Sequence, residues 1–165
     1  MLIRFESSCS LDAVLVQLPF LWRACLKRAR LRVASNITLG VVYGGRAAPY
    51  LRQLARQAGL HVDEWIKMHV SRPYTVLSVG VHPGFACLDE LEPVLQRSVM
   101  ANSREPVFSG GVAVSEFRTA VAASTIPAGW NLVGVISKGH ADDGADLISI
   151  QPGDSVCFER VDVLG

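Results

Sequence analysis

The sequence predicts an α+β protein in which helices dominate the first half and β-strands the second. Up to about Pro73, apolar residues recur mostly at the three- and four-residue spacing of helices. Beyond Pro73 they form short β-type runs separated by glycine and proline, which is typical of a small closed or nearly closed β structure. We therefore expect a small α/β subdomain over residues 1–73 and a β domain over residues 74–165.

Proline and glycine set the expected element boundaries in the first part. Pro19 interrupts an apolar stripe and predicts a kink or break near residue 18. Pro49 suits the first position of a helix, Gly59 suits its stop, and Pro73 ends the next helix. The expected elements are a strand at 2–5, a helix at 11–29 with Ser10 as its N-cap, a strand at 37–43, and helices at 49–58 and 62–70.

The second part reads as a series of strands with one short helix. The near-continuous apolar run at 74–81 predicts a strand covered on both faces. Pro152 and Gly153 have the order that a type II turn requires. The other expected elements are a turn at 82–85, a short helix at 89–96, and strands at 111–117, 119–122, 130–137, 147–150 and 155–161.

Composition excludes several classes of protein. The 165 residues are 50% hydrophobic and 19% charged, which excludes a disordered chain. The net charge of +1 provides no strong field for nucleic acid. The cysteines at 9, 25, 87 and 157 lack metal-ligand spacing, so we expect reduced thiols and no metal site. With neither a secretory signal nor an apolar stretch that could span a membrane, we expect a soluble cytoplasmic protein.

Two short segments are candidate binding sites from their residues alone. In His82-Pro83-Gly84-Phe85, the glycine permits close approach of a ligand and the histidine could exchange protons; the alternative is a rigid turn. Arg118 and Thr119 lie beside Glu116 and could bind an anion, or form a charge pair at a strand edge. His61 and His69 read as structural or surface residues, and the loop at 138–146 as solvated.

Four blocks of the sequence, in order, resemble the KipI/allophanate hydrolase subunit 1 family, which includes the B subunit of bacterial 5-oxoprolinase (PxpB). VVYGG at 41–45, with the helix pair after it, resembles a V-x-Y-G-G block. Residues 74–95 resemble its strand and P-G-F-x-Y-L segment, and residues 104–137 its V-P-A-G, Q-T-G-I-Y-P and P-G-G-W blocks. QPGDSVCFERV at 151–161 resembles its closing P-G-D strand.

The resemblance implies a cyclophilin-like β-barrel preceded by a small α/β subdomain. Because the sequence begins inside the region that matches this subdomain, we expect a truncated subdomain. The resemblance also implies a carboxyltransferase-family subunit that works with two partners, a larger C-type protein of the carboxyltransferase family and an A-type protein. Together such proteins cleave 5-oxoproline to glutamate with ATP, which the subunits share. The isolated chain is therefore expected to be a non-autonomous part of a hydrolase.

The resemblance carries site residues over position by position: Pro83, Gly84 and Phe85 from the P-G-F turn, Arg104 from the arginine before V-P-A-G, Thr119 from Q-T-G, and Pro127, Gly129 and Trp130 from P-G-G-W. We expect Phe85, Arg104, Thr119 and Trp130 to surround one hollow at the barrel rim. This chain has Arg118 for the family's glutamine, Ala122 for the tyrosine of that block, Cys87 for the tyrosine of the P-G-F loop and Phe108 for a proline.

These departures keep alternatives open. The chain could have changed specificity, or be a catalytically degenerate member. It could also be a KipI-like inhibitor of a sensor histidine kinase, because a binding protein can lose catalytic groups and keep its barrel. A part of a biotin-dependent urea carboxylase is a further option, with biotin carried by another chain, since Lys27, Lys67 and Lys138 lack the A-M-K-M context.

Overall fold

A computed structural model describes residues 11–28, 33–45, 48–80, 82–96, 106–127, 129–141 and 147–162. The chain divides into two compact units, Met1–Val33 and Ala34–Gly165. The elements are α1 (Leu11–Arg28), β1 (Asn36–Tyr43), α2 (Leu51–Ala58), α3 (Val62–Val70), β2 (Tyr74–Val79), β3 (Phe85–Glu90), α4 (Pro93–Gln96), β4 (Gly111–Val114), β5 (Arg118–Ala122), β6 (Asn131–Ala141), the 3₁₀ turn η1 (Leu147–Ser149) and β7 (Ser155–Arg160).

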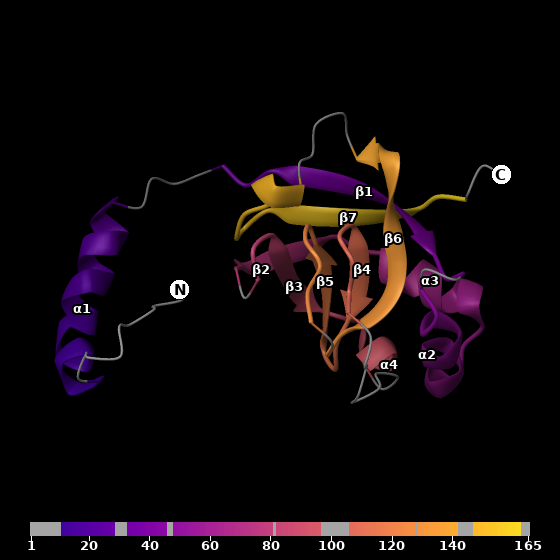
Figure 1. The fold of residues 1–165 in the computed structure, drawn as a ribbon, viewed down its shortest axis with the longest axis horizontal. Helices are drawn as coiled ribbons and strands as arrows, with labels where there is room; N and C mark the ends of the chain where they lie inside the picture. The colour runs from indigo at the N-terminus through magenta and orange to yellow at the C-terminus, as the bar shows by residue number, and fades with distance from the viewer. Residues whose placement is uncertain are drawn as a thin grey trace. The chain divides into compact units, whose positions relative to one another are not determined.

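The second unit is built on a closed barrel in which the strands follow the order β1-β6-β4-β5-β3-β2-β7 (Figure 1). Neighbouring strands pair antiparallel except β1 and β7, which run parallel from Asn36 opposite Ser155 to Val41 opposite Arg160. Closure leaves the barrel without an open strand edge. The expected α+β class with a β-barrel is therefore confirmed.

Strand β1 has a place in the fold that its position in the sequence does not indicate. The sequence places β1 in the first subdomain, but β1 is a barrel strand held by β6 on one side and β7 on the other. The apolar residues of the segments around β1 have helical spacing, which gives no indication of its place in the barrel. The partners of β1 lie about a hundred residues away, and pairing with them leaves no signal in the nearby sequence. The compact unit Ala34–Gly165 contains β1 together with α2, α3 and the other barrel strands.

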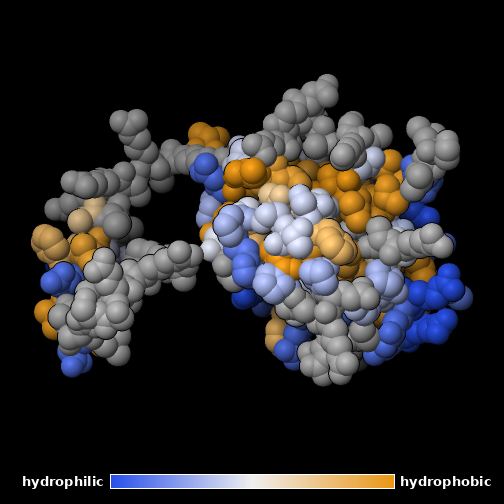
Figure 2. All heavy atoms as spheres, viewed as in Figure 1, coloured by the Kyte–Doolittle hydropathy of each residue, from blue (hydrophilic) through white to orange (hydrophobic). Residues whose placement is uncertain are grey.

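Helices α2 and α3 lie beside each other next to the end of β1 (Figure 1). Their inward residues Leu51, Leu54, Trp65 and Ile66 join the barrel interior in one buried cluster. Gly59 ends α2 with φ +71, the left-handed conformation expected of a helix stop. Hydrophilic residues dominate the outer surface of this helical pair (Figure 2), consistent with exposed Arg52 and Arg56.

Four local expectations are corrected. β2 is covered on one face only: Tyr74 and Val76 are buried while Thr75 and Leu77 are exposed, because a barrel wall has an inside and a solvent side. The short helix begins at Pro93 and not at 89, since β3 extends through Glu90. Residues 147–149 form a 3₁₀ turn instead of a strand. α1 continues through Pro19, which excludes a break there, the alternative that the sequence offered to a kink.

Asp154 ties the start of the barrel to its closing strand. Its two carboxylate oxygens accept hydrogen bonds from the backbone N–H groups of Ser35 (2.8 Å) and Gln151 (2.9 Å). Before it, Gly153 has φ +93, as the expected type II turn requires. Asp154 is fully buried, so these bonds satisfy a carboxylate that burial would otherwise penalise. The P-G-D sequence thus joins the beginnings of β1 and β7.

In the parts of the chain described above, no helix combines the length and apolar character needed to cross a membrane. The predicted strand at 2–5, the Ser10 cap and most of the loop at 138–146 lie outside the described residues, although β6 extends further than expected, to Ala141.

Candidate functional site

The predicted turn at 82–85 packs against the segment that follows β5. The N–H of Phe85 donates to the carbonyl of His82 (3.0 Å) and closes the turn. The N–H of Ala123 donates to Gly84 O (2.9 Å), and the hydroxyl of Ser124 donates to the carbonyl of Pro83. Gly84 has φ +70, and a Cβ there would lie 2.6 Å from the Cβ of Ala123. Glycine is therefore required for both backbone conformation and close packing.

Phe85 and Trp130 meet on the outer face of the barrel wall. Their ring centroids are 5.1 Å apart in an edge-to-face arrangement, at an interplanar angle of 70°. Phe85 is almost fully buried in a second apolar cluster, and Trp130 packs against that cluster while remaining partly exposed. The other buried members are Ala48, Val107, Ala113, Ala120, Ala122, Ile126 and Leu132. The structure thus brings two of the predicted site residues into direct contact.

Thr119 does not join this group, because residues along a strand alternate between its two faces. Ala120 and Ala122 lie in the outer cluster, whereas Thr119 and Val121 face the barrel interior. The Thr119 hydroxyl donates to the carbonyl of Ala113 (3.3 Å) and lies 3.0 Å from Nε2 of His69. The expected hollow around Phe85, Arg104, Thr119 and Trp130 is therefore reduced to the Phe85–Trp130 contact; Arg104 lies outside the described residues.

His69 is the centre of a buried polar chain. Its Nδ1 lies 2.8 Å from the hydroxyl of Tyr43, and Trp65 and Phe158 stack on its ring. Because Thr119 already donates its proton to Ala113, Nε2 of His69 carries the hydrogen and Tyr43 donates to Nδ1. Burial lowers the pKa of His69 to about 3, so the imidazole is neutral. Its role is structural, one of the two roles its position in an apolar helix face suggested.

Arg118 and Cys87 lie side by side on the outer face of strands β5 and β3. Burial raises the pKa of the Cys87 thiol, and the Arg118 guanidinium, which hydrogen-bonds to it, opposes that effect without cancelling it. The thiol therefore stays protonated at neutral pH and lacks the thiolate character of a nucleophile. Arg118 pairs in register with Glu90 of β3. Because its side chain is exposed, Arg118 remains accessible to an anion.

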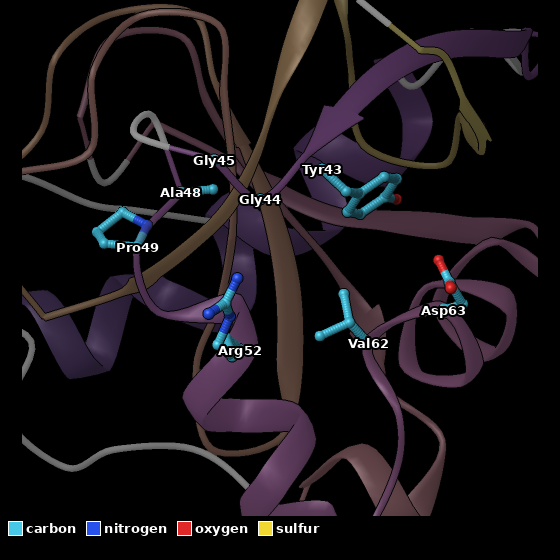
Figure 3. Close-up of a pocket in the computed structure, with 8 residues that line it drawn as sticks. All are labelled: Tyr43, Gly44, Gly45, Ala48, Pro49, Arg52, Val62 and Asp63. Atoms are coloured by element: carbon cyan, nitrogen blue, oxygen red, sulfur yellow. The ribbon is translucent and has the colours of Figure 1, made fainter.

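A pocket of about 600 Å³ lies next to this face (Figure 3). Its lining residues come from the end of β1, the segment before α2, and the first turns of α2 and α3: Tyr43, Gly44, Gly45, Ala48, Pro49, Arg52, Val62 and Asp63. Ala48 also belongs to the cluster that holds Phe85, so the pocket and the predicted site share a wall. The VVYGG block marks Gly44 and Gly45 in the sequence, but no pattern there predicts a cavity.

Comparison with known proteins assigns a family. Residues 1–141 match the model of the carboxyltransferase domain, subdomain C and D. The chain belongs to this carboxyltransferase family. It is 36% identical over 123 residues to the B subunit of 5-oxoprolinase from Escherichia coli O157:H7, a match that covers 74% of this chain and 56% of that protein. It is 30% identical over 124 residues to the protein of the same name from Haemophilus influenzae, covering 74% of this chain and 58% of the relative.

Solved structures of similar fold agree with this assignment. The conserved uncharacterized protein PH0987 from Pyrococcus horikoshii superposes with a TM-score of 0.64 at 25% identity, covering 98% of this chain and 74% of that protein. TTHA0988 superposes with a TM-score of 0.66 at 28% identity, and the match covers 86% of this chain and 28% of TTHA0988. The urea amidolyase of K. lactis, at 16% identity and a TM-score of 0.62, shares the fold. The chain spans little more than half the length of the two 5-oxoprolinase relatives above.

Proposed function

We propose that this carboxyltransferase-family chain is the B-type component of an ATP-dependent 5-oxoprolinase. In this role it works with a larger C-type protein and an A-type protein to convert 5-oxoproline to glutamate in the cytoplasm. The observation that supports the proposal most strongly is the set of three relatives, from three bacteria, that are named as the B subunit of 5-oxoprolinase.

The chemistry explains why such a reaction needs ATP and several proteins. A lactam amide is unreactive toward water, and transfer of a phosphoryl group to its oxygen creates a leaving group. A protein assists by holding the activated ring with donors aimed at the developing charge. This sequence contains no G-x-x-x-x-G-K-[ST] phosphate loop, and on the outer face the exposed Arg118 beside Cys87 contributes a positive charge. We therefore assign ATP binding to a site shared with the partner proteins.

Within the proposal, the partly exposed Trp130 and the turn at His82–Gly84 contact the substrate ring, with Phe85 holding Trp130 in place. Arg118 lies two residues before Ala120 on β5 and therefore on the same outer face, where it provides an exposed positive charge. Thr119 acts indirectly: its hydrogen bonds to His69 and Ala113 hold β5 against β4 and the core.

Reconstitution tests the proposal. We expect the isolated chain to show negligible release of glutamate from 5-oxoproline, with or without ATP. Addition of the A-type and C-type proteins from the same organism should produce ATP-dependent glutamate. Full activity of the isolated chain, or no activity with all three proteins present and folded, would contradict the proposal.

A regulatory role is a second candidate, favoured by one observation. Ala122 stands where the family block has a tyrosine, and it is fully buried in the outer cluster, so this position offers a methyl group and no hydrogen-bonding group. A KipI-like inhibitor of a sensor histidine kinase does not need that group. Autophosphorylation of the kinase, measured with and without the chain, separates the candidates: an unchanged rate at saturating protein removes this one.

A further inference from the structure

None of the residues assigned above to the reaction lines the pocket at the end of β1, and its size suits a small molecule. Its volume of about 600 Å³ is within the range of about 300–1,000 Å³ that is common for ligand pockets. Tyr43 and Val62 face each other across it, and Arg52 extends into it from the first turn of α2 (Figure 3).

Two charged side chains line the pocket, Arg52 and Asp63, and they differ in whether an opposite charge lies beside them. Oδ1 of Asp63 accepts from Nη1 of Arg160 at 2.6 Å, and Nε of Arg160 lies 3.6 Å from Asp162. Arg52 forms neither an ion pair nor a hydrogen bond with any residue that the structure describes. Among the described lining residues, Arg52 is therefore a guanidinium without a carboxylate partner, which favours an anionic ligand.

The backbone beside Arg52 adds to this preference. The N-cap residue of α2, Tyr50, makes no side-chain cap, and the first turn of this helix contains no acidic residue. The amide groups at a helix N-terminus carry partial positive charge, so an anion held by Arg52 would also lie close to them.

The remaining walls are apolar. The hydroxyl of Tyr43 is engaged by His69 in the barrel core, and burial raises its pKa well above the ordinary value, with Tyr74 adding to the effect. The ring of Tyr43 is therefore available to a ligand, but its hydroxyl is not. Ala48, Pro49 and Val62 complete an apolar lining.

We propose that this pocket binds a small monocarboxylic acid, with the carboxylate on Arg52 and the apolar body against Tyr43 and Val62. The planar guanidinium matches a carboxylate through two parallel hydrogen bonds. The site goes beyond the proposed 5-oxoprolinase role, and its ligand binds to this chain alone, whether or not the partner proteins support catalysis.

Titration of the full ¹⁵N-labelled chain with paired probes tests the proposal by NMR. The pairs are cyclopentanecarboxylate with cyclopentanecarboxamide, and benzoate with benzamide; each pair compares a carboxylate with a neutral analogue. We expect at least one carboxylate to shift the amide signals of Gly44, Gly45 and Val62 saturably, with an affinity at least about tenfold above its neutral partner.

Two variants locate the effect. Arg52→Gln should weaken carboxylate binding at least about tenfold, because a charge-assisted pair is lost. Arg56→Gln is the matched control: it removes an exposed arginine from the same helix, outside the pocket, and should leave binding unchanged. Equal affinity for the charged and neutral probes, binding that persists in Arg52→Gln, or no shift with either carboxylate would overturn the proposal.

Discussion

The hydroxyl of Tyr43 lies 2.8 Å from Nδ1 of His69, and through this bond the wall of a surface pocket is joined to the core of the barrel. The opposite nitrogen of the same ring lies 3.0 Å from the Thr119 hydroxyl. One histidine thus connects the last residue of β1, helix α3 and strand β5. Segments that are far apart in the sequence depend on this ring for their relative positions.

Replacement of His69 should strongly destabilise the protein. His69→Ala leaves the hydroxyl of Tyr43 without its buried acceptor and opens a cavity between Trp65 and Phe158. We expect a loss of about 3–5 kcal/mol in the free energy of unfolding, measured in urea. Lys67→Ala, an exposed change on the same helix, should cost less than about 0.5 kcal/mol. Similar losses for the two variants would contradict the buried network.

The neutral state of His69 also predicts a pH dependence. Its pKa is about 3 in the folded protein and near 6.5 when unfolded, so the unfolded chain binds more protons between these values. The stabilisation is complete above pH 6.5 and is lost as the pH falls toward 3, by up to about 1.4 kcal/mol per pH unit. The difference in unfolding free energy between wild type and His69→Gln should shrink over this window. A difference independent of pH would show that His69 titrates normally.

Gly84 and Gly59 form a matched pair for the turn of the predicted site. Both have φ near +70, but only Gly84 faces a neighbour, Ala123, at a distance that excludes a Cβ. Gly59→Ala should cost about 1–2 kcal/mol from backbone strain alone. Gly84→Ala should cost about 1–2 kcal/mol more, because the turn must move away from Ala123. Thermal unfolding of the two variants measures the difference, and equal losses would mean that the turn yields freely.

Replacement of Trp130 distinguishes the contribution of this side chain to substrate binding from its contribution to stability. Trp130→Ala removes the edge contact with Phe85 and should cost about 1–2 kcal/mol in stability. In the reconstituted complex it should lower ATP-dependent glutamate release at least about tenfold, because substrate positioning is lost. Phe117→Ala, which removes another exposed aromatic ring, should leave the rate near wild type. Equal rates for both variants would remove Trp130 from the proposed site.

The α+β class, most element positions and the family could be predicted from the amino-acid sequence. Helix α2 between Pro49 and Gly59, the turn at 82–85 and the Pro152–Gly153 turn follow from local backbone preferences, which act over a few residues. The Phe85 turn and the Trp130 block are recognisable as motifs for the same reason, because each depends on residues that are close together in the sequence.

The side of the barrel wall that each motif faces, and the pairing of distant strands, became known from the folded chain. The fold placed β1 in the barrel, turned Thr119 inward to His69 while Phe85 and Trp130 meet outside, and brought Arg52 and Val62 into the lining of one pocket. A shift of one residue in strand register exchanges the two faces, and pairing with a distant strand sets that register. Nearby residues therefore carry no sign of it.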